Sequence, residues 1–415
     1  MTLAVAALVA APAAASAASR YAAPTSQGTG DCSSAANACP IATAVGGASS
    51  GDNILVLANL GSYNLGSSTI APGASTTLHF YGVSGRPTLF NDGSNYVMHL
   101  TAPSSSAENL ALETGGMSFS PTTGTITVDR MFATSTNQSC YFGGGVTMTN
   151  SVCWGDGNEP GGPVLETDGT NTLRNDVVWA TGTIAYGIRN FGRGGRNGDD
   201  ILINTIVRDT ESGSSDLYAN SDGTQTATFD VSYSNYATTQ AAGDAALDHF
   251  NGDSTDQTTF PALVDPNTGN FHEQSTSSTI NSGVTSAANG SEDLDGNPRT
   301  VNGKTDIGAY ELGTPTTPPP PKTTPPHNTT ITSPTINKQK HTASFQFTAS
   351  GTVTGFECGL IKPKKKHHKK PKLKFSPCSS PKTYKHLGHG KYTFEVRAVN
   401  SAGPDPSPAV KQFKI

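Results

Sequence analysis

A five-residue pattern that recurs between residues 107 and 233 constrains the fold more than any other feature. It consists of an apolar residue, any residue, an asparagine or its substitute, any residue, and a second apolar residue. Its central positions, spaced by 20 to 29 residues, are Asn109, Arg130, Asn150, Asn175, Asn204 and Val231. Repeats of this length without helices are typical of solenoids made of stacked β-coils. An asparagine at a fixed corner of each coil can adopt a left-handed bend and hydrogen-bond the same position in neighbouring coils.

The sequence between these positions predicts strands. Short β-branched and aromatic runs alternate with Gly, Ser, Asn and Asp, for example at Asn53–Asn59, Thr77–Val83, Thr125–Thr134 and Asp200–Val207. Such runs are typical of strands bounded by turns. One short helix is expected over Pro40–Val45, because proline suits the first turn of a helix. The alternative fold is a β-sandwich, whose strands recur about every 8 to 12 residues without a repeated asparagine.

The first 17 residues predict export from the cell. Leu3–Ala17 is apolar and rich in alanine, and it ends in Ala15-Ser16-Ala17, small residues that a signal peptidase accepts. We expect cleavage after Ala17, although no Lys or Arg precedes the apolar run as in an ordinary signal. The alternative is a buried N-terminal helix, since the run is too short to cross a bilayer. The mature chain is expected to be secreted or associated with the cell surface, with no transmembrane segment.

The six cysteines fit an exported protein. They form three close pairs, namely Cys32 with Cys39, Cys140 with Cys153, and Cys358 with Cys378. An even number at short spacing, together with an export signal, predicts three disulfides. No CxxC motif occurs, so a zinc site is disfavoured and no metal ligands are predicted.

The charge distribution separates two unlike parts of the chain. Residues 1–312 contain ten Lys and Arg against 29 Asp and Glu, a net charge of −19, whereas residues 313–415 contain 17 against three, a net charge of +14. The proline-rich residues 313–327 (GTPTTPPPPKTTPPH) begin the basic part and are expected to be extended and semi-rigid. The predicted organisation is a signal peptide at residues 1–17, a β-helix at residues 18–312, this linker, and a second domain at residues 328–415.

Motifs near the end of the acidic part resemble those of a known family. They are Val264–Pro266, Gly269–His272, Ser277–Gly283 and Leu294–Glu311, the last of which reads LDGNPRTVNGKTDIGAYE. These stretches resemble the closing region of the choice-of-anchor Q domain, a secreted bacterial family with a right-handed parallel β-helix. Ser278 stands where the family usually has Pro, and Asn281 stands where it usually has Asp.

The beginning of the acidic part resembles the opening of the same family. There Cys32 and Cys39 precede a short alanine-rich helix and Gly51–Ile54. In the family the corresponding cysteines form a bridge and the helix caps the first coil. The resemblance covers roughly residues 31–312 and implies an exported right-handed parallel β-helix, while the family has no established common activity.

Alternating residues predict a β-sandwich in the basic part. Four runs alternate apolar and polar residues, as strands with one buried face do, at Ser344–Ala349, Gly355–Leu360, Tyr392–Val399 and Lys411–Ile415. These runs resemble immunoglobulin-like or fibronectin-like modules of bacterial surface proteins. The predicted fold class is therefore all-β, a right-handed parallel β-helix followed by a small immunoglobulin-like β-sandwich.

Charged residues around one repeat strand suggest a catalytic hypothesis. Hydrolysis of a polysaccharide uses two carboxyl groups placed close together. Asp199 and Asp200 could serve as the general acid and the general base, with Arg208 nearby. Three arginines that precede them in the chain, Arg189, Arg193 and Arg196, could act as clamps that hold an anionic sugar. However, adjacent strand residues point to opposite faces, and Asp beside Gly is also what a turn requires. We favour the turn, and the catalytic residues stay unassigned.

A calcium site is suggested by the sequence Asp293–Gly296. An EF-hand loop requires Gly at its sixth place and Glu at its twelfth, where this sequence has Pro298 and Lys304. We therefore expect no cofactor there, and instead a structural turn in which Arg299 pairs with Asp306 or Asp295.

The densest run of charge lies between Cys358 and Cys378. Residues 362–374 (KPKKKHHKKPKLK) contain eight lysines, which on a β-sandwich would form a hairpin loop with a cationic tip. Such a tip binds anionic polymers in a salt-sensitive manner. No aromatic residue is interleaved, so no specific nucleic-acid recognition is expected. The alternative is a solvated loop without a dedicated partner. The expected binding residues are Lys364, Lys365, Lys366, Lys369, Lys370 and Lys372.

These features favour a secreted or cell-surface protein without catalytic activity, which acts in binding or adhesion at the cell envelope and is docked there by its basic module. The expected partner is cell-envelope polysaccharide or another anionic polymer, and the expected state is a monomer. The alternative function is an extracellular polysaccharide lyase or glycoside hydrolase that acts in the β-helix groove.

Overall fold

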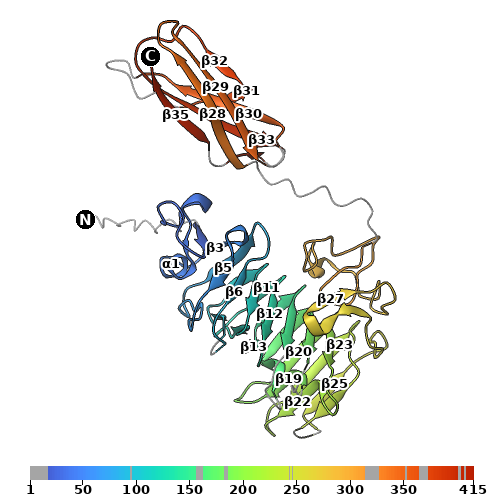
Figure 1. The fold of residues 1–415 in the computed structure, drawn as a ribbon. Coiled ribbons are helices and arrows are strands. Elements are labelled where there is room, and N and C mark those ends of the chain that lie inside the picture. Colours follow the sequence, from blue (N-terminus) through green and yellow to red (C-terminus); the bar gives the residue numbers. More distant parts are fainter. Residues whose placement is uncertain are drawn as a thin grey trace, which may run out of the picture. The chain divides into compact units, whose positions relative to one another are not determined.

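The computed structural model contains two compact units, Met1–Thr314 and Pro315–Ile415 (Figure 1). It describes residues 17–93, 96–155, 162–181, 186–242, 244, 246–313, 327–350, 353–363, 373–400, 403–405 and 408–415. Most of the expected signal peptide, residues 1–16, and all six expected polymer-binding lysines therefore lie outside the described residues. The first unit is a parallel β-helix and the second consists of antiparallel sheets, which confirms the predicted all-β fold class.

The β-helix consists of three parallel sheets, here called A, B and C, and each coil from β5 to β22 contributes one strand to each of them. Sheet A contains β1 (Ser19–Ala23), β2 (Cys39–Pro40), β3 (Asp52–Leu57), β5 (Leu78–Val83), β8 (Ser106–Glu108), β11 (Ile126–Asp129), β14 (Val146–Thr149), β17 (Thr170–Arg174), β20 (Gly198–Ile203), β23 (Ala227–Ser232) and β25 (Asp248–Asn251). Sheet B contains β4 (Tyr63–Asn64), β6 (Thr88–Phe90), β9 (Ala111–Glu113), β12 (Phe132–Ser135), β15 (Val152–Gly155), β18 (Val177–Ala180) and β21 (Ile206–Asp209). Sheet C contains β7 (Met98–Leu100), β10 (Met117–Phe119), β13 (Cys140–Phe142), β16 (Pro163–Asp168), β19 (Tyr186–Gly192), β22 (Ser215–Ser221) and β24 (Thr239–Ala241).

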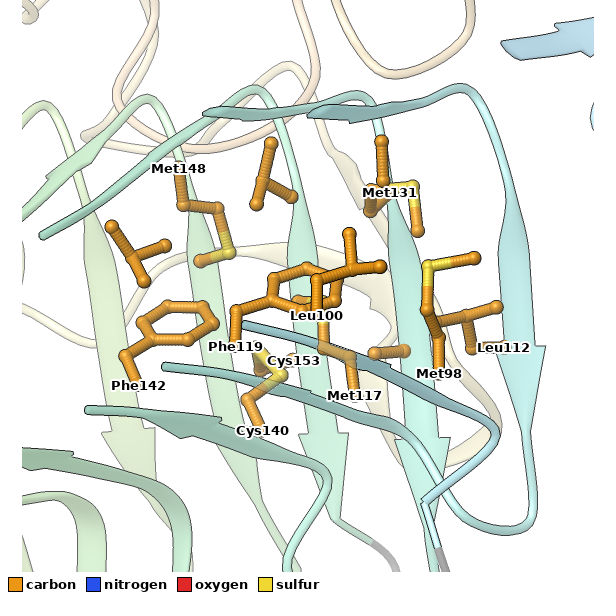
Figure 2. Packing of buried hydrophobic residues seen from close by; sticks show 14 of the residues in the cluster. Met98, Leu100, Leu112, Met117, Phe119, Met131, Cys140, Phe142, Met148 and Cys153 are labelled. Carbon is orange, nitrogen blue, oxygen red and sulfur yellow. A yellow bond between two sulfur atoms is a disulfide. The ribbon is translucent and has the colours of Figure 1, made fainter. Parts of the chain in front are cut away.

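Side chains that point into the β-helix are aligned from coil to coil. The strand register places four buried residues of sheet A in one row, Val128, Met148, Leu173 and Leu202. In sheet C, Phe119 stands beside Phe142 and the two rings stack with centroids 6.4 Å apart (Figure 2). Because strands of a sheet are about 4.8 Å apart, like residues at equivalent positions pack on one another without gaps.

The corner between sheets A and B is left-handed in successive coils. Asn109, Arg130, Asn150, Asn175 and Asn204 have φ between 50° and 56°. In the next coil the left-handed residue is Tyr233, with φ of 49°. The predicted centre, Val231, is wrong, because Val231 pairs with Leu202 inside β23. This coil has no asparagine, and alignment of its flanking apolar residues placed the centre two residues too early.

The same corners divide two of the predicted strands. The run Thr125–Thr134 covers β11 and most of β12, and the run Asp200–Val207 covers parts of β20 and β21. In each case the corner residue turns the chain from sheet A into sheet B. A run of β-forming residues does not show this bend, because the corner residue keeps the alternation of its neighbours.

Residues 261–312, here called the strap, fold back along the outer face of sheet B (Figure 1). The strap contains β26 (Leu263–Asp265), β27 (Asn270–Glu273) and the 3-10 helices η3 (Pro266–Thr268) and η4 (Ala287–Asn289). Its apolar residues Leu263, Phe271, Leu294, Ile307 and Tyr310 form a buried cluster with Val152, Val177, Trp179 and Ile206 of sheet B. The motifs that resemble the family signature therefore build this cover.

The corner asparagines bind the strap as well as one another. Asn175 donates to Oδ1 of Asn150 at 3.2 Å and to the carbonyl oxygen of Asn289 at 3.2 Å. Asn204 donates to Oδ1 of Asn175 at 2.8 Å and to the carbonyl oxygen of Val284 at 2.9 Å. The predicted hydrogen bonds between coils thus exist, and the strap supplies the remaining acceptors.

A buried ion pair lies within the strap. Arg299 Nη2 is 2.7 Å from Glu311 Oε2, and both side chains are at most 1% exposed. Arg299 also donates to three backbone carbonyl oxygens, those of Asp306, Gly308 and Tyr310. The predicted pairing of Arg299 with the carboxylate of Asp306 or Asp295 is therefore wrong, because the carboxylate partner is Glu311.

The N-terminal end of the β-helix is closed by a short helix, α1 (Ile41–Gly46), which begins after Pro40 close to the predicted position. The 3-10 helices η1 (Ala35–Asn37) and η2 (Ala58–Leu60) lie on either side of it in the chain. All six cysteines are paired as predicted: Cys32 with Cys39, Cys140 with Cys153, and Cys358 with Cys378. The second disulfide is fully buried and joins β13 to β15 across the core (Figure 2).

The second unit is a β-sandwich with its own core. One sheet contains β28 (His327–Asn337), β29 (Thr342–Ser350) and β32 (Lys382–Tyr384). The other contains β30 (Gly355–Ile361), β31 (Ser376–Cys378), β33 (Lys391–Asn400), β34 (Gly403–Pro404) and β35 (Ala409–Lys414). Phe345 of the first sheet stacks on Phe394 of the second, with ring centroids 4.1 Å apart. The four predicted strands correspond to β29, β30, β33 and β35.

Candidate functional site

The three sheets of the β-helix present different side chains on their outer faces. Sheet B is covered by the strap. In its middle coils, sheet A presents a row of small hydroxyl side chains, Ser106, Thr127, Thr147 and Thr172. Sheet C presents a row of larger ones, Tyr141, Glu166, Arg189 and Tyr218. This row and its neighbours Asp168, Tyr186, Phe191 and Arg193 are here called the sheet C face, and we take it as the candidate site.

Strand alternation brings these residues together. In β16, Glu166 and Asp168 point outward while Leu165 and Thr167 are buried, and Arg189 and Phe191 alternate with buried residues of β19 in the same way. Adjacent strands place Glu166 beside Arg189, and Asp168 beside Phe191. Charged and aromatic side chains thus form one continuous patch.

The carboxylates of the sheet C face are held by arginines. Arg189 Nη2 is 2.6 Å from Glu166 Oε2, and Arg193 Nη2 is 2.7 Å from Glu166 Oε1. Arg193 Nε and Nη2 bond the two oxygens of Asp168, at 2.9 and 3.0 Å. Tyr141 donates its hydroxyl to Asp168 at 2.8 Å, and burial together with this bond raises the pKa of Tyr141 to about 12. All four carboxylate oxygens therefore accept hydrogen bonds from protein donors.

Aromatic rings flank this network. The rings of Tyr186 and Tyr218 pack against each other with centroids 4.0 Å apart and their planes tilted by 33°. Partial burial and the neighbouring Tyr186 hydroxyl raise the pKa of Tyr218. The guanidinium of Arg193 lies 3.9 Å from the centre of the Phe191 ring, which fixes its position. The face thus combines apolar ring surfaces with oriented hydrogen-bonding groups, a combination that small polar ligands such as sugars require.

The first pair of predicted catalytic candidates lies elsewhere. Asp199 and Asp200 occupy β20 and point to opposite sides of sheet A, as expected for adjacent strand residues. Asp200 is 1% exposed and accepts hydrogen bonds from Thr167 and Asn171 inside the β-helix. Burial raises the pKa of Asp200 to about 7. A carboxyl group enclosed in this way reaches no polymer outside.

The third candidate, Arg208, is part of the structure of sheet B. It is 2% exposed, pairs with Asp216 at 3.2 Å and donates to Asn235 at 2.9 Å. It also donates to the carbonyl oxygens of Thr258 and Thr259. Arg208 therefore faces neither Asp199 nor Asp200, and the three candidates form no common site.

The carboxyl group that does neighbour Asp199 is that of Asp230. The strand register places Asp199 opposite Thr228, two residues before Asp230, so both aspartates lie on the outer face of sheet A. Partial burial and the charge of Asp230 raise the pKa of Asp199. The sequence did not indicate this pair, because the two residues belong to different coils.

The other predicted ligand groups have structural surroundings. Asp293 accepts hydrogen bonds from the backbone N–H groups of Asn297 and Glu311, and Asp295 pairs with His272 at 2.7 Å. Among the described residues, no group of three or more His, Cys, Asp or Glu is arranged to hold a metal ion. In the same part of the chain, no helix is long and apolar enough to cross a membrane.

Comparison with known proteins adds little to this description. No family model matches the chain, and no curated protein matches it either. Among solved structures, the pectate lyase Pel9A aligns with a TM-score of 0.40 and 12% identity, over 72% of this chain and 97% of its own length. The fold is established by the strand register described above.

Proposed function

We propose that this protein is an extracellular polysaccharide-binding protein without catalytic activity, and that its ligand lies on the sheet C face. The observation that carries the proposal is the combination, on one parallel sheet, of two packed tyrosine rings with a network of arginines and carboxylates. Aromatic rings offer apolar surface to a sugar ring, and oriented polar side chains beside them bond its hydroxyl groups. Strands about 4.8 Å apart repeat such contacts along a polymer.

Binding without catalysis is favoured by the state of the two carboxylates. Hydrolysis requires one carboxyl group that donates a proton and a second that acts on water or on the sugar. Glu166 and Asp168 are instead bonded at every oxygen by Arg189, Arg193 and Tyr141. Such carboxylates hold the arginines in place, and each of their oxygens is engaged by at least one protein donor.

Glycoside hydrolysis is the second candidate function, and the pair Asp199 and Asp230 favours it. A carboxyl group whose pKa is raised beside another carboxylate has the property that a general acid needs. Catalysis would then occur on the outer face of sheet A, away from the sheet C face. The two functions are therefore separable by single substitutions.

The location and the retention of the protein belong to the same proposal. Export is supported by the three disulfides and by the resemblance of residues 31–312 to the choice-of-anchor Q domain. We propose that the β-sandwich is an immunoglobulin-like module and that its basic segment, Lys364 to Lys372, holds the protein on anionic polymer of the envelope. The protein would act there as a monomer.

The test is binding of the full chain to a panel of soluble polysaccharides, measured by affinity electrophoresis and calorimetry. In the protein used for this test, glutamine replaces the six lysines of the basic segment. The measured binding is then binding to the β-helix and not to the basic segment. Tyr218→Ala removes one of the two packed tyrosine rings and is expected to weaken binding about tenfold, which corresponds to ~1.4 kcal/mol. The matched control is Tyr81→Ala, which removes a tyrosine from the outer face of sheet A.

Two results would contradict the proposal. If no polysaccharide of the panel binds, or if Tyr81→Ala weakens binding as much as Tyr218→Ala does, the sheet C face is not the site. If reducing ends or unsaturated uronates are released and Asp199→Asn abolishes their release, the protein is an enzyme of sheet A. Binding that depends on Tyr218 without release of products supports the proposal.

A further inference from the structure

The turn between β19 and β20 has a charge arrangement unlike the rest of the first unit. Three of the ten Lys and Arg of residues 1–312 are exposed, namely Arg193, Arg196 and Lys304. Two of the three lie in residues 193–196, here called the arginine turn. From Asp209 to Pro298 the sequence contains 14 Asp and Glu and no Lys or Arg. The arginine turn is therefore a cationic spot on an otherwise acidic unit.

The backbone holds the two arginines side by side. Gly194 and Gly195 both have positive φ, 62° and 80°, as a two-residue hairpin turn requires. Arg196 N donates to the carbonyl oxygen of Arg193 at 3.1 Å, and the two residues form an antiparallel bridge. Residues that stand opposite each other in a hairpin carry their side chains on the same face, and like charges at such positions destabilise the hairpin. Proteins retain such a local conflict where it serves a function.

The carboxylates around the turn leave one positive charge without a partner. Glu166 and Asp168 pair with Arg189 and Arg193. Arg196 donates from Nη1 to the carbonyl oxygen of Gly143 at 3.2 Å, and it makes no ion pair with a carboxylate of the described residues. A further carboxylate near the turn, that of Asp222, accepts a hydrogen bond from the backbone of Gly194 and forms no ion pair with an arginine of the turn among the described residues.

The surface beside Arg196 is formed by glycine backbone. Gly143–Gly145 and Gly169 form the corner between sheets C and A in the two preceding coils. A Cβ atom at Gly144 would lie 3.2 Å from Cα of Gly169, so the coils pack backbone against backbone here. Glycines permit close approach of another molecule to the backbone. An anionic group that binds Arg196 can therefore also approach the backbone of this corner, whose Gly143 carbonyl Arg196 already contacts.

We infer that the ligand of the sheet C face is an acidic polysaccharide, whose carboxylate or sulfate group binds Arg196 and the outward N–H groups of Arg193. This inference rests on the proposed function and specifies the class of its ligand. The acidic group supplies the anionic partner that Arg196 lacks among the described residues, through charge-assisted hydrogen bonds to guanidinium groups. A neighbouring sugar of the same chain lies on the aromatic rings.

The test compares each acidic polysaccharide with its neutral form. The probes are polygalacturonate, alginate and hyaluronan against their carboxyl-reduced forms, and chondroitin sulfate against desulfated chondroitin. The full chain again carries glutamine at the six lysines of the basic segment. Arg196→Gln is expected to weaken binding of the acidic form about tenfold and to leave binding of the neutral form unchanged. The control Lys304→Gln removes an exposed charge outside the face and is expected to change neither.

The outcomes separate this inference from the proposed function. Preference for a carboxylate or a sulfate form that Arg196→Gln removes supports the inference and shows which acid is bound. Equal binding of both forms, weakened by Tyr218→Ala, overturns the inference and leaves the proposed function intact. An equal loss for both forms in Arg196→Gln indicates a structural role and also overturns it. Binding to no probe of the panel overturns the proposed function itself.

Discussion

Among single residues, Glu273 is a buried carboxyl group of the strap whose protonation depends on folding. It is 5% exposed and accepts a hydrogen bond from the hydroxyl of Thr279. Burial, followed by the hydrogen bond to Asp306, raises the pKa of Glu273 to about 9. The folded protein therefore keeps a proton at Glu273 over a pH range in which the unfolded chain has lost it.

We predict that Glu273→Gln removes part of the pH dependence of stability. Between about pH 4.5 and 9 the folded state binds one more proton than the unfolded state at this residue, so this contribution is full at low pH and is lost as pH rises. The loss is at most about 1.4 kcal/mol per pH unit. The variant should gain stability relative to the wild type from pH 5 to 9, as measured by urea unfolding.

The control for this prediction is Asp265→Asn, which removes an exposed carboxylate of the same strap. Its stability should follow that of the wild type at every pH. Parallel curves for the wild type and Glu273→Gln would show that Glu273 is already ionised in the folded protein.

The structural role of a single residue could be predicted from the sequence where its residue type has one physical reason to be present. Asn150, Asn175 and Asn204 were predictable, because asparagine tolerates a left-handed backbone and bonds its equivalents. Tyr233 was not, since nothing in its side chain marks it as a corner. The partner of Arg299 was also not predictable, because several carboxylates lie close in sequence and the fold alone selects Glu311.

At the scale of elements, the strap holds several coils through one aromatic contact. Phe271 lies against three rings of sheet B, with centroid distances of 6.4 Å to Phe132, 6.0 Å to Trp154 and 5.7 Å to Trp179. Trp154 and Trp179 are the two tryptophans of the chain. Tryptophan fluorescence therefore reports directly on whether the strap is in place.

We predict that Phe271→Ala loosens the strap before the coils unfold. Loss of a buried phenylalanine costs about 3–5 kcal/mol. Iodide quenching of tryptophan should rise in the variant under native conditions, while its circular dichroism stays that of a β-protein. The control Phe229→Ala removes a ring inside the coils. It should lower the stability without raising the iodide quenching of tryptophan in the folded protein. Unchanged quenching in Phe271→Ala would mean that the remaining strap contacts suffice.

Elements could be predicted from sequence as far as their pattern is local. The strands follow from alternating residues, but the place of the strap depends on contacts between distant parts of the chain. The sequence suggested Arg189, Arg193 and Arg196 as clamps on an anionic sugar, and the structure places the first two on the sheet C face. The face as a whole was missed because turns of different length separate its row from the corners. Tyr141 and Glu166 precede their corners by nine residues, whereas Arg189 and Tyr218 precede theirs by 15. The arginine turn accounts for the longer interval after Arg189.

At the scale of the whole molecule, the two units have separate cores. The buried clusters of the β-helix and the strap share no residue with the cluster that contains Phe345 and Phe394. Both tryptophans belong to the first unit. A fluorescence signal from tryptophan thus follows one unit, whereas circular dichroism follows both.

We predict that denaturant unfolding of the full chain is not a single two-state transition. Circular dichroism should show a transition that tryptophan fluorescence lacks, because each unit unfolds by itself. Phe394→Ala should lower the midpoint of that second transition and leave the fluorescence midpoint unchanged, since Phe394 is fully buried in the β-sandwich. Coincident transitions that shift together in Phe394→Ala would contradict the independence of the units.

The strap also determines when the β-helix can be finished during synthesis. Arg86 donates to the carbonyl oxygen of Leu294, and Arg130 pairs with Glu292. The early coils therefore leave the ribosome long before the residues that cover them. Unlike a solenoid that grows stably coil by coil, this one stays incomplete until Glu311 has emerged. Its first coils must remain soluble during that interval without their cover, which gives the exposed strands of sheet B a particular need for chaperones.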